Sequence, residues 1–173
     1  MATATITVKL KSDITKVWDL VTSLDNYSWR SDLSKIVVLD DGKKFIEYTK
    51  DGYPTNFTVT VFEPLKRWEF DIENDNMLGH WIGVFSFKDG ETTIDFSEDV
   101  TAKKQIMKPF VGTYLRKQQK AYVEDLKKAL SNKYKLTSNI QEFQSMALEK
   151  YKQDVIKLAI AEDCSIGVST GEV

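Results

Sequence analysis

The chain has 173 residues, 42% hydrophobic and 29% charged, which fits a packed globular domain and excludes a largely disordered or fibrous protein. Its 24 basic and 26 acidic residues give a net charge of -2, so nucleic acid is not an expected partner. The single histidine, His80, and single cysteine, Cys164, leave no expected metal site, internal disulfide or Cys/His nucleophile.

The chain also lacks the usual signals for export, membrane insertion or cofactor binding. Its first residues have neither the basic start nor the apolar run of a secretory signal, and no apolar stretch approaches the roughly 20 residues of a membrane span. No glycine-rich phosphate loop occurs. We therefore expect a cytoplasmic protein without a membrane span and without a cofactor.

The first elements in chain order are a strand and a short helix. Residues 5–10 alternate polar and apolar side chains, which predicts a half-buried strand. Asp13 can cap a helix over 13–22, where Ile14, Val17, Trp18 and Val21 recur at helical spacing. A second short helix is expected to begin at Asp25.

From residue 33 onward the pattern has the period of strands. Turn signals, including Asp-Gly pairs at 41–42 and 89–90, divide it into successive antiparallel strands. The expected strands cover 34–40, 43–50, 55–62, 66–73, 78–88 and 91–101.

A long amphipathic helix is predicted next, over 105–131, with Pro109 in its first turn. Residues 132–173 are expected to form a separate helical appendage with a second helix over about 138–160 and a flexible end. The predicted fold is α+β, with a curved antiparallel sheet of about seven strands around a long C-terminal helix, plus the extra helix. The domains are thus 1–131 and 132–173.

Three local sequences resemble the START-like, or SRPBCC, superfamily, particularly its polyketide cyclase/dehydrase-like branch. They are TKVWDLV at 15–21 with LDNYSW at 24–29, GHW at 79–81 leading to DGETT at 89–93 and EDV at 98–100, and the helix over 109–130. The resemblance implies a helix-grip fold with a hydrophobic cavity between sheet and helix. It also implies relatives that bind lipids, sterols, polyketides or plant hormones.

Glu98 is the candidate for acid-base chemistry. It falls in phase with the apolar Ile94, Phe96 and Val100 of its strand, which would aim its carboxylate at the interior and raise its pKa. The alternative is that Glu98 reaches water or an arginine at the strand end. The other candidate ligand-binding residues are Tyr48, Trp68, Phe70, His80, Trp81, Phe96 and Tyr114. Arg30 and Asp32 are interpreted as a surface ion pair at the cavity entrance.

Three functions remain open from the sequence. The first is binding of a small hydrophobic molecule, such as a lipid, polyketide or isoprenoid-like compound. The second is a cyclase or dehydratase-like enzyme in which Glu98, with His80 or Tyr48, moves protons. The third is protein interaction through the apolar stripe of the helix over 138–160, which would pack in a homodimer, on the domain itself or on another partner.

Overall fold

The computed structural model describes residues 1–166, apart from the side chains of Met107, 133–139, 142 and 154–166. It divides into two units, Met1–Leu130 and Ser131–Val173. The first unit holds the sheet and the cavity described below.

One seven-stranded sheet, entirely antiparallel, forms the body of the first unit. Its order is β1-β7-β6-β5-β4-β3-β2, so strands that follow one another from β2 to β7 pair directly, and β1 closes onto β7. The strands are β1 (Ala2–Leu10), β2 (Leu33–Leu39), β3 (Lys44–Thr49), β4 (Pro54–Glu63), β5 (Arg67–Glu73), β6 (Met77–Lys88) and β7 (Glu91–Ala102).

Alternation along the strands determines which side chains lie inside. On β5, Trp68, Phe70 and Ile72 are buried, whereas Arg67, Asp71 and Glu73 are exposed. Pairing extends the inner face across the sheet: Phe45 of β3 lies opposite Phe57 of β4, and their rings stack with centroids 4.7 Å apart. The inner face is therefore rich in aromatic side chains.

Helix α1 (Ile14–Thr22) begins where the sequence indicates. Asp13 is its N-cap, and its side chain accepts a hydrogen bond of 2.9 Å from the Thr15 N–H. The predicted second helix at Asp25 is wrong, because residues 23–32 form turns and bends. The indole of Trp18 packs edge-on against Phe62 and Phe85, which joins α1 to the sheet.

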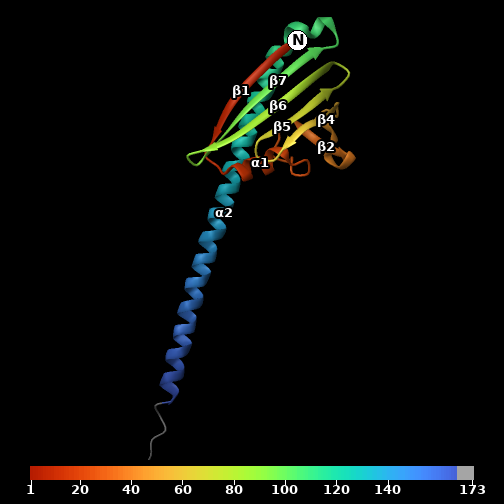
Figure 1. Cartoon of the computed structure of the whole chain (residues 1–173). Coiled ribbons are helices and arrows are strands. Elements are labelled where there is room, and N and C mark those ends of the chain that lie inside the picture. The colour runs from red at the N-terminus through yellow and green to blue at the C-terminus, as the bar shows by residue number, and fades with distance from the viewer. Residues whose placement is uncertain (167–173) are drawn as a thin grey trace, which may run out of the picture. The chain divides into compact units, whose positions relative to one another are not determined.

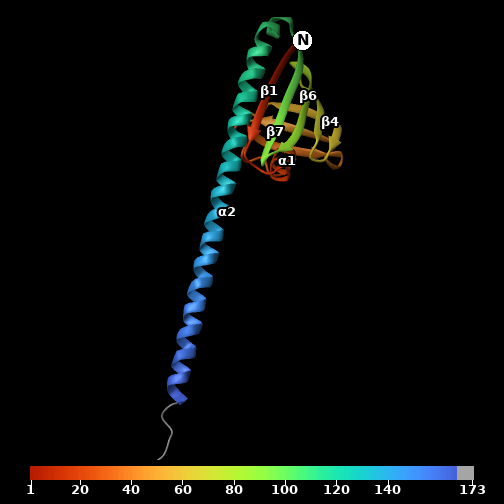
Figure 2. The same ribbon diagram turned by 60° about the vertical axis from the view of Figure 1, so that its left-hand side comes forward.

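Helix α2 covers the inner face of the sheet with its first part (Figures 1 and 2). After a short 3-10 turn, Gln105–Met107, it begins at Lys108 and ends at Ile166. Leu115, Val123, Leu126 and Leu130 are buried in the core, and Gln119 Nε2 donates a hydrogen bond of 3.1 Å to the carbonyl of Ala4 on β1.

The helix predicted over 138–160 is continuous with α2, and no break separates the two predicted helices. Residues 131–166 contain neither glycine nor proline, so nothing in their backbone chemistry forces an end to the helix. Most of the chain end predicted to be flexible, from residue 167 onward, lies outside the described residues.

Candidate ligand-binding cavity

A cavity of about 480 Å³ lies within the first unit, between the inner face of the sheet, residues 21–33 and the first part of α2. Most of its wall is apolar or aromatic. Trp29, Phe45, Phe57, Trp68, Phe70, Trp81, Phe96, Phe110, Tyr114 and Tyr122 all line it. Such a wall suits an apolar ligand, and the few polar groups that interrupt it would determine orientation.

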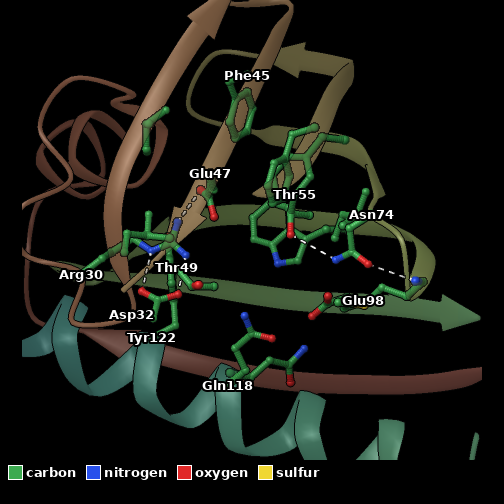
Figure 3. Close-up of a pocket in the computed structure, with 18 of the residues that line it drawn as sticks. Arg30, Asp32, Phe45, Glu47, Thr49, Thr55, Asn74, Glu98, Gln118 and Tyr122 are labelled. Carbon is green, nitrogen blue, oxygen red and sulfur yellow. Dashed lines mark hydrogen bonds and ion pairs between the residues drawn. The ribbon is translucent and has the colours of Figure 1, made fainter. Parts of the chain in front are cut away.

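A cluster of charges is built into this wall around Arg30 (Figure 3). Its Nε and Nη2 donate to the two carboxylate oxygens of Asp32 at 3.1 and 2.8 Å, and Nη1 donates to Glu47 at 2.6 Å. The side chains of Arg30 and Glu47 are only 15% and 13% exposed. The sequence interpretation of Arg30 and Asp32 as a surface pair is therefore wrong, because the guanidinium is largely buried and is shared with a strand carboxylate.

Aromatic rings hold the guanidinium from the helix side. The centre of the Arg30 guanidinium lies 5.3 Å from the ring centroid of Tyr122 on α2, a cation–π distance. Trp29 packs edge-on against the same tyrosine ring at 5.2 Å. The turn at 23–32 is thus tied to α2 by side chains that also line the cavity.

Glu98 lies on the inner face of β7, as its phase with Phe96 and Val100 indicates (Figure 3). Burial raises the pKa of its carboxyl group from 4.5 to about 7, and the negative charge of Glu47 contributes to the same shift. Among the described residues, no hydrogen bond or ion pair satisfies this carboxyl group. At neutral pH it can therefore both accept and donate a proton.

A neutral polar group occupies another part of the wall. Asn74 Nδ2 donates to the hydroxyl of Thr55 at 3.1 Å, and its Oδ1 accepts the backbone N–H groups of Asn76 and Met77 (Figure 3). Asn76 Nδ2 in turn donates to the Tyr53 hydroxyl at 2.8 Å. These two amides in the cavity wall therefore already have hydrogen-bond partners within the protein.

The structure brings together six of the residues singled out in the sequence. Trp68, Phe70, Trp81, Phe96, Glu98 and Tyr114 all line the cavity. Tyr48 and His80 do not. Tyr48 lies on the other face of β3, near Lys35 Nζ, and His80 lies on the outer face of β6, where its ring contacts Asp71 and Glu69.

Sequence reasoning missed Glu47, the second inward-facing glutamate. On β3 the two parities are both partly apolar, Phe45 on one side and Ile46 with Tyr48 on the other, so alternation alone does not choose between them. The available signal is the pairing with β4: because Phe57 alternates with exposed threonines, its partner Phe45 must also face inward, and Glu47 shares that phase.

No group of histidine, cysteine, aspartate and glutamate suited to a metal ion occurs among the residues that the structure describes. In the same part of the chain, no helix is long and apolar enough to cross a membrane.

Comparison with known proteins agrees with this architecture. The family model described as polyketide cyclase / dehydrase and lipid transport matches residues 1–131. The chain belongs to this family. A search of curated proteins finds no match.

Solved structures with the same fold include proteins of remote sequence. A START superfamily protein from Mycobacterium smegmatis has a TM-score of 0.64 at 13% identity, covering 76% of this chain and 99% of that one. A conserved protein from Geobacillus kaustophilus has a TM-score of 0.65 at 10% identity, covering 75% and 95%. The di-domain ARO/CYC BexL, from the BE-7585A biosynthetic pathway, has a TM-score of 0.65 at 10% identity, covering 76% of this chain and 47% of that one. The chain shares the START-like helix-grip fold with these proteins.

Proposed function

We propose that the unit Met1–Leu130 binds a small lipophilic molecule, of the lipid, polyketide or isoprenoid class, in the cavity between sheet and helix. The observation that carries the proposal is the cavity itself: about 480 Å³ with a wall of aromatic side chains. This volume is within the range of roughly 300–1,000 Å³ of small-molecule pockets. Burial of the apolar surface of a ligand, worth ~25 cal/mol per Å², would supply affinity.

The test is a titration with N-phenyl-1-naphthylamine, an apolar dye whose fluorescence rises in a dry environment. Gln118 lines the cavity from α2, so Gln118→Trp should fill part of the space and weaken dye binding by about tenfold or more. Lys117→Trp adds the same side chain at the neighbouring, exposed position and is the matched control. Equal dye binding by both variants would contradict binding in this cavity.

A natural ligand can be sought in parallel. Small molecules extracted from the protein purified out of its native host would be compared by mass spectrometry with those from an unrelated control protein. Enrichment of one lipophilic compound supports the proposal and supplies a candidate substrate.

Glu98 favours a second candidate function, a cyclase or dehydratase-like enzyme. With its pKa at about 7, the carboxylate can remove a proton from a bound substrate and return it to another atom without a cofactor. Glu98→Gln should then retain binding of the extracted compound and abolish its conversion. Unchanged turnover in this variant would remove Glu98 from the mechanism.

For the second unit, Ser131–Val173, we propose that the part of α2 over residues 138–160 joins two copies of the chain. Ile140, Phe143 and Tyr151 are large apolar side chains that remain 50%, 73% and 67% exposed. Phe143→Glu should halve the molar mass measured by light scattering, whereas Gln144→Glu should leave it unchanged. A monomeric mass for the unmodified chain would contradict the dimer.

A further inference from the structure

The charges around the cavity do not balance. Of the described residues that line it, Arg30 is the one basic side chain, whereas Asp32, Glu47 and Glu98 contribute three carboxyl groups. When all of them are ionised, the wall carries more negative than positive charge, in a space where apolar side chains reduce screening by water.

The positive charge of Arg30 is already engaged. Its guanidinium donates to both oxygens of Asp32 and to Glu47, so it faces carboxylates on two sides. An anionic ligand that approached Arg30 would therefore meet the negative charges of Asp32 and Glu47 beside it. Glu98 is left without an opposite charge, and Glu47 acts on it by repulsion.

The surroundings of Glu98 favour a cation. Trp81 is its direct partner across β6 and β7, and the Trp81 ring packs against that of Phe96 with centroids 5.2 Å apart. An ammonium group beside an unpaired carboxylate and aromatic rings gains both a charge-assisted hydrogen bond and cation–π attraction. The other titratable groups that act on Glu98 are Glu47 from β3 and Tyr114 from α2, and neither supplies a positive charge.

We propose that this cavity selects lipophilic molecules that carry a basic amine, which binds as an ammonium ion against Glu98. This inference rests on the proposed binding function and narrows its ligand class. In this proposal Arg30 is a positioning residue, because its guanidinium binds Asp32 and Glu47 in the cavity wall. Glu98 then remains as the carboxylate that can pair with the ammonium group of the ligand. The apolar body of the ligand would occupy the aromatic part of the cavity.

The test compares three compounds of similar size: 2-(2-naphthyl)ethylamine, 2-(2-naphthyl)ethanol and 3-(2-naphthyl)propanoic acid. Their affinities are measured by calorimetry with the full chain at pH 8, where a primary amine, with a pKa of about 10, is still protonated. We expect the amine to bind about tenfold or more tightly than the alcohol, and the acid to bind most weakly.

Two variants locate the effect. Glu98→Gln should reduce the advantage of the amine over the alcohol to about twofold or less, while alcohol binding, which reports an intact cavity, is retained. Asp99→Asn removes the same charge from the next residue of β7, on the outer face, and should retain the advantage. If Glu98→Gln does not fold, the unmodified chain at pH 5.5 provides the same comparison, since Glu98 is then protonated and the advantage should collapse.

The outcomes separate this inference from the proposed function. An alcohol that binds as tightly as the amine would overturn the amine preference and leave lipophilic binding intact. An advantage that persists in Glu98→Gln, or at pH 5.5, would overturn the assignment to Glu98. Failure of all three compounds to bind would count against both proposals.

Discussion

Arg30 and Glu47 lie 2.6 Å apart, Nη1 to Oε1, and connect the turn at 23–32 to the inner face of β3. Burial alone lowers the pKa of Arg30, but the facing Glu47 and Asp32 carboxylates raise it above its ordinary value. The guanidinium therefore stays charged inside the cavity wall. A buried charge that has lost its partner is strongly destabilising, whereas an exposed pair contributes little.

Replacing Arg30 tests whether the buried ion pairs of the cavity wall stabilise the protein more than an exposed pair does. Arg30→Met leaves Glu47 and Asp32 without their counter-charge and should lower the free energy of unfolding by about 3 kcal/mol in urea titrations. Lys103 offers a control, because it pairs with Glu73 at 2.9 Å and the two side chains are 35% and 62% exposed. Lys103→Met should cost less than about 1 kcal/mol. Equal losses would contradict a special role for the buried cluster.

The raised pKa of Glu98 makes stability depend on pH. Because the folded pKa, about 7, exceeds its ordinary value of 4.5, ionisation of Glu98 opposes folding, and the loss develops as pH rises from about 4.5 through 7. Glu98→Gln should therefore stabilise the protein by about 2–3 kcal/mol at pH 8.5 and have little effect at pH 4.5. Equal effects at both pH values would show that burial does not penalise this carboxylate.

Gly83 provides space for the Trp81 ring. A Cβ atom added there would lie 2.4 Å from Cη2 of Trp81, so Gly83→Ala must displace the indole from its place in the cavity wall. We expect a loss of about 1–3 kcal/mol and a change in tryptophan emission. Gly112→Ala on α2 meets only ordinary contacts and should instead gain about 0.5–1 kcal/mol. The same sign for both substitutions would contradict this account.

His80 should couple stability to pH in a different window, on the outer face of the sheet. Burial alone lowers its pKa, but hydrogen bonds to Asp71 and Glu69 raise it above its ordinary value of 6.5. Its stabilising contribution is complete below 6.5 and is lost as pH rises through the folded pKa. His80→Asn should therefore destabilise the protein more at pH 5.5 than at pH 9, in chemical denaturation at each pH. In a chain that already carries Asp71→Asn, the destabilisation caused by His80→Asn should differ less between pH 5.5 and pH 9. If that difference is unchanged, Asp71 is not the source of the raised pKa of His80.

The sequence predicted most of the strands to within one or two residues, because Asp-Gly turns and alternation mark their ends. It left two placements open for Glu98, inward or towards water or an arginine at the strand end, and the structure has Glu98 on the inner face because it lies in the apolar phase of β7. The predicted helix at Asp25 failed because its residues instead form the turn that places Trp29 and Arg30 against Tyr122. The residues in this contact lie far apart in the sequence, so no local sequence pattern indicates it.

The remaining site residues required knowledge of pairing between strands. Tyr48 and His80 lie in strands whose two faces are both partly apolar, so single-strand alternation did not determine their direction. For β6, the pairing register with β5 determines which face each side chain lies on. His80 lies opposite the exposed Asp71, and Trp81 lies opposite the buried Phe70. The burial of Arg30 depends on its contact with Glu47, which lies on β3 and not in the turn at 23–32. Neither relationship is visible in composition or period.

The pairing of β1 with β7 has a consequence for the newly made chain. Of the seven strands in the sheet, β1 is the first to leave the ribosome, yet the strand that it pairs with in the described part of the chain, β7, is the last of the seven to be synthesised. At roughly 5–20 residues per second, Ile6, Val8 and Leu10 wait several seconds without the partner that will cover their edge. In the nascent chain, β1 therefore lacks the strand that pairs with it until β7 has left the ribosome, so the sheet can be completed only after residue 102 has been made.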